Sequence, residues 1–375
     1  MKSIKEIVNG SKALLKVNSF LARYYLIIMI LLIFSLMSYY VYVQITKKNT
    51  NNKTMNQNLD DIKTVISNVS TNDAQHKFNL RDYYIMSSYN SCCNGDFDNS
   101  YVTKDALKTV ISKGCRVLDF EVYSYDSKTV IAASASENFF EKGTYNYLPF
   151  NDVIDLVSNY AFSAGTSPNF NDPLILHFRI KSNKNHVYDD MTKSITTSLN
   201  QYRLPPKYNN ESNGENITAE PLTNFLGKAI IVVDSSNKMY KNTPLDEIIN
   251  LTSSSIFIKN LRDYDVKFAP SVNELIESNK KNMAITYCDL SSSSENMNPA
   301  IHFKTGCQCV CMNFQSLDDN LVFYINKFND KNTAFVLKPE HLRYEPILAK
   351  TPTKQNKDLS YAPKELKKPY FRHVL

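Results

Sequence analysis

The sequence predicts an α/β protein with a TIM-type (β/α)8 barrel, preceded by one transmembrane helix. Three observations lead to this prediction. Short apolar runs alternate with segments of helical periodicity, the segment from Tyr24 to Val43 carries no charge, and 375 residues leave room for one large domain of roughly 250 residues with appendages. A content of 43% hydrophobic residues with only eight glycines excludes a collagen-like or wholly disordered chain.

The segment from Tyr24 to Val43 has the length and composition of a membrane span. At 1.5 Å per residue, ~20 helical residues cross the ~30 Å apolar core of a bilayer. Tyrosines gather at both of its ends, as in interfacial aromatic belts. A secretory signal peptide would be shorter and would end in small residues, and a helix packed on one side against the core of a soluble domain would show a polar face. We therefore expect a transmembrane anchor, with the lipid bilayer as a partner.

The basic residues around this span predict its orientation. Five lysines and arginines precede it in the basic N-terminal segment 1–23, and three lysines follow it closely. The positive-inside rule then predicts a cytoplasmic N-terminus, with the barrel on the outer or lumenal side. Glycosylation sequons after the span fit that side, although an Asn-rich chain also produces them by chance. They begin at Asn52, Asn68, Asn210, Asn216 and Asn250.

The net charge of +6 lies at the two ends of the chain. Residues 1–48 and 350–375 carry net charges of +6 and +5, which leaves −5 for the residues between them. A nucleic-acid-binding protein carries its positive charge on the folded domain, so this distribution excludes nucleic acid as a partner. Residues 44–75 are polar apart from a short helical patch around Ile62 and predict a stalk. Residues 349–375 are basic, contain three prolines and predict an extended or loosely docked tail.

Strands and helices alternate between residues 76 and 348. The segment TKDALKTVISKG has helical apolar spacing, with Thr103 as a candidate N-cap and Gly114 just past the end. VYDDMTKSITTSL repeats apolar residues every four positions and predicts another helix. Short apolar runs predict strands at RVLDFEVY, KTVIAA, PLILHFRI and KAIIVVD. About eight such strands over ~270 residues fit a (β/α)8 barrel, whose active site would lie at the C-terminal ends of the strands.

Seven cysteines follow the span, an odd number in a large domain, so no small disulfide scaffold is indicated. Cys307, Cys309 and Cys311 alternate, which places all three on one face of a strand. A thiolate metal site is one interpretation. Buried small hydrophobic residues are the favoured one, because zinc-binding cysteines usually lie about two to four residues apart on turns.

Six segments, collinear and similarly spaced, resemble the barrel of phosphoinositide-specific phospholipase C. The resemblance covers about residues 80–343, with a first half at 80–234 and a second half at 256–343. It implies a PLC-like phosphodiesterase barrel without the accessory modules of that family, for which the chain has no room. The six segments are RDYYIMSSYNSC, LKTVISKGCRVLDFEVY, PLILHFRI, FLGKAIIVVD, NMNPAIHFKTGCQCVCMNFQ and TAFVLKPEHLR.

The chemistry that this resemblance implies has definite requirements. Cleavage of the phosphodiester needs a general base, a general acid and a cation near the developing charge. In the enzymes that this chain resembles, two histidines and a calcium ion serve these roles. Here the two histidine positions correspond to Tyr89, in Ser-Ser-Tyr-Asn, and to Ala133. A phenol with a pKa of ~10 is a poor base at neutral pH, and alanine transfers no proton.

The calcium position of the family is partly retained. Asn90 matches one ligand, and Asp119 and Glu121 lie two residues apart on one strand face, so these three could still hold calcium. The fourth ligand, a glutamate in the family, corresponds to Arg179. A guanidinium there would pair with Asp119 or Glu121 and take over the electrostatic role of the metal. We therefore expect no cofactor, with calcium as one only if the metal site still functions.

The substrate-binding positions are altered as well. Two lysines of the family correspond to Val232 and Asp234, which replaces attraction for a phosphate by neutrality and repulsion. Tyr287 is retained as a ring that could lie against the headgroup. His177 lies two residues before Arg179 on the same side of its strand and could substitute for a lost histidine. A structural histidine in the barrel interior is the favoured interpretation.

Two hypotheses for the function remain. In the first, the chain is a membrane-anchored phospholipase C-like protein that is catalytically inactive and binds a phospholipid or protein partner, or has a structural role at a surface. In the second, it is a divergent phosphoric diester hydrolase that uses Asn90, Asp119, Glu121, His177 and Tyr89. The loss of two proton-transfer groups, each worth ~10² to 10⁴ in rate, favours the first. A composition typical of AT-rich coding and the reduced, anchored barrel make a large DNA virus or a parasite plausible hosts, and a viral membrane a plausible location.

Overall fold

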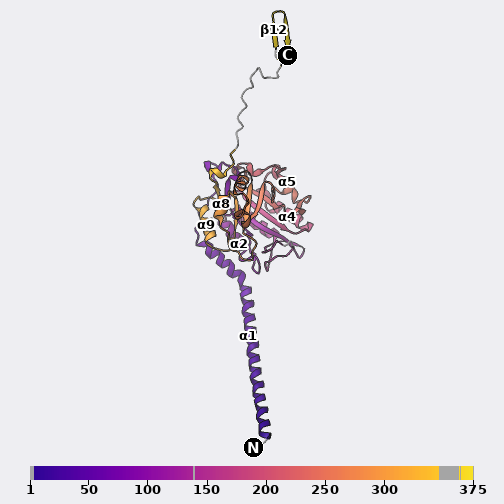
Figure 1. The fold of residues 1–375 in the computed structure, drawn as a ribbon, viewed down its shortest axis with the longest axis vertical. Helices are drawn as coiled ribbons and strands as arrows, with labels where there is room; N and C mark the ends of the chain where they lie inside the picture. Colours follow the sequence, from indigo (N-terminus) through magenta and orange to yellow (C-terminus); the bar gives the residue numbers. More distant parts are fainter. Residues whose placement is uncertain (1–3, 138–139, 346–362, 364, 375) are drawn as a thin grey trace. The chain divides into compact units, whose positions relative to one another are not determined.

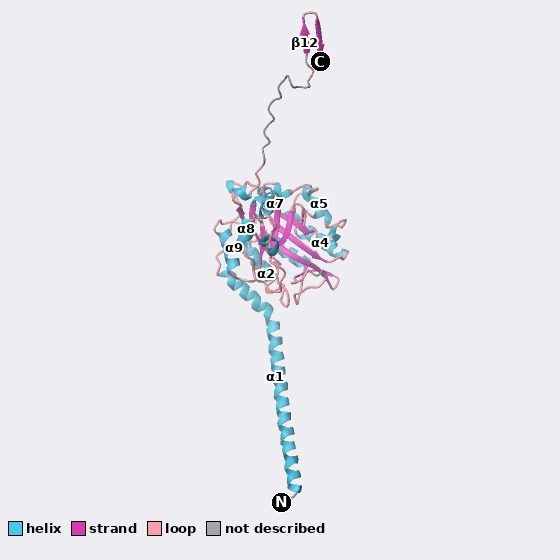
Figure 2. Ribbon diagram, viewed as in Figure 1, coloured by secondary structure: helices cyan, strands magenta, loops and turns pink. Residues whose placement is uncertain are grey.

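The computed structural model describes residues 4–137, 140–345, 363 and 365–374. The chain divides into two units, Met1–Arg343 and Tyr344–Leu375. In the first unit, a barrel of parallel strands lies inside a layer of helices (Figures 1 and 2). One large cluster of buried apolar side chains from both layers forms the core.

Eight strands form the barrel, in the spatial order β7, β6, β5, β2, β1, β10, β9, β8, and every hydrogen-bonded pair in this series is parallel. β7 and β8 are its two edges, and no ladder joins them in the described structure. At this gap, which we call the seam, Asn260 Nδ2 on β8 donates to Ser253 Oγ on β7 at 2.9 Å. The predicted TIM-type barrel is thus confirmed, closed everywhere except at the seam. Its strands are β1 (Tyr83–Ser88), β2 (Val117–Tyr125), β5 (Leu174–Lys181), β6 (Ala229–Asp234), β7 (Leu251–Ser253), β8 (Ile258–Arg262), β9 (Met283–Tyr287) and β10 (Cys309–Met312).

Helices link most of the successive barrel strands and cover the outside of the barrel (Figure 2). Between β7 and β8 the chain makes only a turn over residues 254–257, all of which are described, so no helix covers the seam there. The α-helices are α1 (Ile4–Asp60), α2 (Lys104–Ser112), α3 (Phe150–Ala161), α4 (Asn185–Ser198), α5 (Asn209–Ser212), α6 (Asp263–Lys267), α7 (Val272–Lys281), α8 (Pro299–Lys304) and α9 (Asp319–Asn329).

Helix α2 begins and ends where the sequence predicts. Thr103 Oγ1 accepts a hydrogen bond from the backbone N–H of Ala106 at 3.1 Å and so caps the first turn. Past the last turn, Gly114 has a φ of +92°, a conformation that side-chain-bearing residues rarely adopt. The predicted apolar repeat of residues 187–199 likewise forms α4, and its buried side chains face the core.

Gly114 gives a direct test of this turn. We expect Gly114→Ala to lower the free energy of unfolding by about 1–3 kcal/mol, because φ is positive there and the new Cβ would lie 3.0 Å from Ile66 Cγ2. Gly165→Ala is the matched control, since its Cβ would meet only Ser163 Oγ at 4.0 Å, and we expect a change within about 0.5 kcal/mol. Urea unfolding of both variants measures the difference. Equal losses would show that the conformation of Gly114 is not what matters.

The segment KTVIAA forms the predicted strand, but outside the parallel set. This strand, β3 (Lys128–Ala132), pairs antiparallel with β2. Only Asp126 and Ser127 connect the two strands, and both have positive φ, of 49° and 58°. Two residues make a tight hairpin turn and are too few for the crossover that a parallel neighbour requires. Two further short strands extend the sheet outside the barrel: β4 (Leu148–Pro149) on β3, and β11 (Phe335–Leu337) antiparallel to β1.

Residues 44–75, which the sequence predicts to be a polar stalk, pack against the barrel instead. Residues 44–60 continue helix α1 and pack against the barrel, with Met55 and Leu59 buried in the core. Beyond the helix, Ile66 and Val69 are buried as well. The sequence does not reveal this, because the helix contributes few apolar residues and docks mainly through polar side chains. Most of the predicted stalk is therefore part of the barrel unit.

The apolar segment from Tyr24 to Val43 lies inside α1, and its side chains are exposed along the whole segment, with the exposed fraction falling to 37% only at Val43. Among the described residues, the part of α1 from Arg23 to Asp60 is long and apolar enough to cross a membrane, by length and composition. Strand β7, only three residues long, lies between the two predicted halves of the barrel, where the sequence predicts no strand.

The second unit contains an antiparallel hairpin of β12 (Glu365–Lys368) and β13 (Phe371–Val374). The sequence predicts no such hairpin in the tail 349–375, and the rest of that tail is almost entirely outside the described residues.

All seven cysteines are free and buried. This confirms the interpretation of Cys307, Cys309 and Cys311 as buried small side chains.

Candidate functional site

The candidate site lies in the barrel interior, where β1, β2 and β5 end. Strands β2 and β5 are paired in register, so that Asp119 lies opposite His177 and Glu121 opposite Arg179. Because side chains alternate along a strand, all four project to the same face of the sheet. Asn90 follows β1 in a left-handed conformation, with a φ of 41°. The structure therefore brings together the residues that the sequence singled out on these three strands.

Arg179 is the centre of this cluster, and each of its five N–H groups has an acceptor. Its Nε donates to Asp119 Oδ1 at 3.0 Å, and its Nη2 donates to Asp119 Oδ2 at 2.7 Å. The second Nη2 proton goes to Asn90 Oδ1 at 2.9 Å. Nη1 donates to Glu121 Oε1 at 2.6 Å and to the Tyr89 hydroxyl at 3.3 Å. The sequence predicted a pair with either carboxylate, and the structure has both.

The two carboxylates of this cluster also accept hydrogen bonds at both of their oxygens. Asp119 Oδ1 also meets His177 Nδ1 at 2.7 Å, and Asp119 Oδ2 accepts from the backbone N–H of Asn90 at 3.1 Å. Asp119 thus has four hydrogen-bond partners, as many as a carboxylate accepts. On Glu121, Oε2 accepts from the Tyr123 hydroxyl at 2.6 Å and from the backbone N–H of Ser134 at 3.0 Å.

Burial makes these ion pairs strong and their partners interdependent. Arg179 is 4% exposed, Asp119 0% and Glu121 2%. Burial alone would raise the pKa of Asp119, but the charge of Arg179 and the hydrogen bond from His177 hold that pKa well below its ordinary value. Burial alone would lower the pKa of Arg179, and the neighbouring Asp119, Tyr89 and Glu121 raise it well above its ordinary value instead. Asp119 and Arg179 are therefore both ionised at neutral pH.

Aromatic rings enclose the guanidinium. The Tyr89 ring lies 4.6 Å from Arg179 Cζ and the Tyr287 ring 5.4 Å from it, both within the range of cation–π contacts. Burial raises the pKa of Tyr89, although Arg179 partly offsets this. The phenol is thus a weaker acid than in water, and it accepts hydrogen bonds from Arg179 and, at 3.4 Å, from Arg262 Nη1. At the position of the second family histidine, Ala133 is fully buried.

His177 lies between a carboxylate and a hydroxyl. Its Nδ1 is 2.7 Å from Asp119 Oδ1, and its Nε2 is 2.7 Å from Ser253 Oγ. This is the order of groups in a serine nucleophile triad. Ser253 is fully buried, however, and its Oγ also accepts from Asn260 Nδ2 across the seam, so the hydroxyl is held in a network and not presented to a substrate.

The other substrate-binding positions predicted from the sequence lie nearby, but their side chains are buried or hydrogen-bonded to other residues of the protein. Val232 is buried in β6. Asp234 accepts hydrogen bonds from Ser236 at 2.7 Å and from Ser254 at 2.6 Å. The Tyr287 hydroxyl lies 3.2 Å from Asn260 Oδ1 and 3.3 Å from His177 Nδ1. None of these three offers a positive charge to a phosphate.

The residues present do not fit a calcium ion. Calcium needs six to eight oxygen ligands around an open centre. Here a guanidinium occupies the centre between Asn90, Asp119 and Glu121, and the lone pairs of Asp119 are used. Among the described residues, no group of three or more histidine, cysteine, aspartate or glutamate side chains is arranged to hold a metal.

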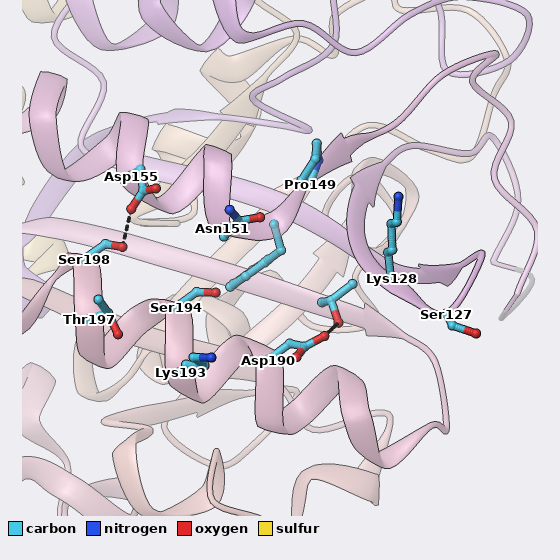
Figure 3. Close-up of a pocket in the computed structure, with 12 residues that line it drawn as sticks. Ser127, Lys128, Pro149, Asn151, Asp155, Asp190, Lys193, Ser194, Thr197 and Ser198 are labelled. Atoms are coloured by element: carbon cyan, nitrogen blue, oxygen red, sulfur yellow. Dashed lines mark hydrogen bonds between the residues drawn. The ribbon is translucent and has the colours of Figure 1, made fainter.

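A hollow of about 340 Å³ opens above this cluster at the barrel mouth. Its charged lining is mixed, with basic Arg179, Lys181 and Arg262 opposite acidic Glu137, Asp234 and Asp265. Another hollow, of about 490 Å³, lies outside the barrel between α3, α4 and the β2–β3 turn (Figure 3). Its carboxylates, Asp155 and Asp190, bind the hydroxyls of Ser198 and Thr129 respectively. The second hollow therefore brings together no unpaired catalytic groups.

Sequence reasoning missed several residues of the site. Ser253 and Asn260 complete the network of His177, and Arg262 contacts the Tyr89 hydroxyl while it forms an ion pair with Glu137 at 3.0 Å. Ser253 lies in the short strand β7, which has no recognisable pattern. Asn260 and Arg262 alternate along β8, the one signal that could have placed both on the inner face of the barrel.

Two family models match the chain. The X domain of phosphatidylinositol-specific phospholipase C matches residues 76–235, and the Y domain of phosphatidylinositol-specific phospholipase C matches residues 236–341. The two matches adjoin and together span all eight strands of the barrel. No curated protein has a matching sequence.

Solved structures share this fold at low sequence identity. PLC21 of L. pealei superposes with a TM-score of 0.59 at 17% identity, and PLC21 of S. officinalis with 0.57 at 16% identity. Each match covers 72% of this chain and 38% of the other, so this chain spans well under half the length of these relatives. A calcium-dependent phosphoinositol-specific phospholipase C from Pseudomonas sp. has a TM-score of 0.45 at 8% identity, with 70% and 97% of the chains covered.

Proposed function

Because the chain belongs to the phosphatidylinositol-specific phospholipase C family over residues 76–341, we propose that it is a membrane-anchored member that has lost phosphodiester hydrolysis. In this proposal, the barrel is retained as a binding or structural surface protein whose partner is a phospholipid or another protein. The proposal combines an anchor at residues 24–43 with a barrel whose central charges are neutralised from within.

The single observation that carries the loss of activity is the position of Arg179. A metal that stabilises the charge on a phosphodiester in the transition state must keep an open coordination position. The guanidinium of Arg179 uses all five of its donors on protein acceptors, so it has none left for a phosphate oxygen. It supplies the charge that holds the barrel together but not the charge that catalysis needs.

The proton-transfer positions support the same proposal. Tyr89 corresponds to one histidine of the family, and its hydroxyl, with a raised pKa, is held by two arginines. Ala133 corresponds to the other and has no titratable group. General acid–base groups each contribute ~10² to 10⁴ to a rate, so the absence of both costs ~10⁴ or more.

The anchor is proposed from α1. Its exposed apolar segment is long enough to cross a bilayer by length and composition, and basic residues are more frequent before it than after it. We propose a cytoplasmic N-terminus, with the barrel on the outer or lumenal side.

One observation favours a second function. His177 is positioned by Asp119 and faces Ser253, an arrangement that could move a proton in a divergent phosphoric diester hydrolase. In that alternative, His177 would act with Asn90, Asp119, Glu121 and Tyr89 on a phosphoinositide or related phospholipid. Full burial of His177 and Ser253 argues against it.

The test is hydrolysis by the full chain in phosphatidylinositol vesicles, with and without calcium. The full chain is needed, because a cut near residue 75 would remove the buried Met55, Leu59, Ile66 and Val69. We expect no release of inositol phosphate above the protein-free background. Turnover that is present in the wild type and abolished in His177→Ala would establish the divergent enzyme instead. A variant at the exposed Phe323, Phe323→Ala, controls for loss of folded protein.

A further inference from the structure

Helix α1 docks on the barrel in a fixed direction relative to α2. Asn52 Oδ1 accepts from Thr103 Oγ1 at 2.8 Å, at the N-terminus of α2. Four residues further along α1 and six further along α2, Asn56 Oδ1 accepts from Thr109 Oγ1 at 2.5 Å. Lys113, past the end of α2, approaches Asp60 at 3.8 Å. The two helices therefore run parallel to each other along the outside of the barrel.

This direction identifies the end of the barrel from which the apolar segment leaves. Helix α2 follows β1 and precedes β2, so its N-terminus lies at the C-terminal ends of the strands and its C-terminus at their N-terminal ends. Because α1 runs parallel to α2, its earlier residues lie towards the C-terminal ends of the strands. That end also carries the hollow lined by Arg179, Lys181 and Arg262.

The barrel begins where the apolar segment ends. Gln44, the residue directly after Val43, accepts a hydrogen bond at its backbone carbonyl from the Tyr101 hydroxyl at 3.0 Å. Lys47 Nζ donates to the backbone carbonyl of Asn99 at 2.7 Å. Residues 44–48 span ~6 Å of helix, which is about the thickness of one headgroup layer. No spacer separates the apolar segment from the barrel.

The part of the barrel at this level has interfacial chemistry. The Tyr145 ring lies 5.4 Å from that of Tyr101, the residue whose hydroxyl contacts Gln44. Nearby, Lys142 Nζ lies 5.1 Å from the centre of the Tyr125 ring. Tyr125 and Tyr145 are 43% and 44% exposed. Tyrosine and lysine are the residues that collect at the boundary between lipid and water.

We propose that α1 holds the C-terminal rim of the barrel against the bilayer that it spans, so that the hollow at the barrel mouth faces lipid headgroups. The rim here means Asn99, Tyr101, Tyr125, Lys142 and Tyr145. The inference rests on the proposed membrane anchor and adds the orientation of the barrel. The partner at the barrel mouth is then the surface of the same membrane, because a rigid helix without a spacer leaves no clearance for a soluble macromolecule.

Single tryptophans test this orientation, since the chain contains none. The full chain is reconstituted in vesicles as Tyr145→Trp at the rim, Val65→Trp at the opposite end of the barrel, or Phe34→Trp within the apolar segment. The backbone N–H of Val65, which follows α1, donates to Asn329 Oδ1 at 3.3 Å, and the helical rise from Gln44 to Asp60 separates the two levels by ~24 Å. Lipids brominated at shallow or deep acyl positions quench the fluorescence.

We expect shallow bromines to quench Tyr145→Trp several-fold more than Val65→Trp, and deep bromines to quench Phe34→Trp. Quenching of Val65→Trp that equals or exceeds that of Tyr145→Trp overturns the orientation while the anchor stands. Absence of quenching at Phe34→Trp overturns the anchor itself and with it the orientation. Tyr125→Trp repeats the rim measurement if Tyr145→Trp does not fold.

Discussion

Replacing Arg179 by alanine is expected to lower the free energy of unfolding by about 3–5 kcal/mol, the cost of leaving buried charges without a partner. Asp119 and Glu121 are 0% and 2% exposed, and Arg179 is the cation that both contact. The same substitution leaves Asn90 Oδ1 and the Tyr89 hydroxyl without their shared donor. No other substitution of one residue in the described barrel removes so many buried bonds at Asp119 and Glu121 together.

Urea unfolding of the full chain measures this loss. Arg262→Ala is the matched control, because Arg262 lies at the same mouth and its partner Glu137 is 62% exposed on its side chain. We expect that control to cost about 1 kcal/mol, as for exposed ion pairs and single hydrogen bonds. Equal losses in the two variants would contradict a central role for Arg179.

The loss of unfolding free energy in Arg179→Ala should depend on pH in a definite direction. In the wild type, the pKa of Asp119 lies below its ordinary value, so the stability that it contributes is present above the unfolded pKa and is lost as the pH falls towards the folded one. Without Arg179, burial dominates and the folded pKa of Asp119 rises, so the variant regains stability by binding a proton. The difference between the two proteins should therefore be larger at pH 7 than at pH 4.

Replacing Arg179 by glutamate is expected to create calcium binding. The wild type places a fixed guanidinium between Asn90, Asp119 and Glu121, which repels a divalent cation, so we expect no measurable affinity at millimolar calcium. Arg179→Glu removes that charge and restores a third carboxylate. We expect a dissociation constant of ~10⁻⁴ to 10⁻³ M, in the range of weak oxygen-ligand sites.

Titration calorimetry and thermal unfolding, each with and without calcium, test the substitution. Because calcium would bind only the folded variant, its midpoint of unfolding should rise with calcium concentration, while that of the wild type should not. Arg179→Gln, which removes the charge without adding a ligand, should bind calcium more weakly than Arg179→Glu. Tight calcium binding by the wild type would contradict the role given to Arg179.

The sequence predicts those parts of the fold that depend on local patterns. The cap at Thr103, the turn at Gly114 and the strands around Asp119 and Arg179 follow from residue types and spacing alone, and the structure has them as expected. The proximity of Arg179 to the two carboxylates was expected from family positions. That all five donors are used could not be expected, because it depends on the rotamers of Tyr89 and Asn90.

Other features depend on contacts between distant segments that carry no pattern. β7 has three residues, and Ser253 gains its role only because β8 places Asn260 opposite it. The docking of α1 depends on asparagine side chains such as Asn52, which in a polar segment are indistinguishable from those of a solvated linker. In both cases, the energy lies in polar bonds across the fold, and hydrophobic periodicity does not report them.

The guanidinium of Arg179, with its five hydrogen bonds, is a permanent part of the chain. A bound metal leaves when its concentration falls, whereas a side chain stays at the same position under all conditions. The charge balance at the centre of the barrel is therefore constitutive and carries no information about calcium levels. The charge balance at this one position would therefore be the same in a calcium-poor and in a calcium-rich compartment.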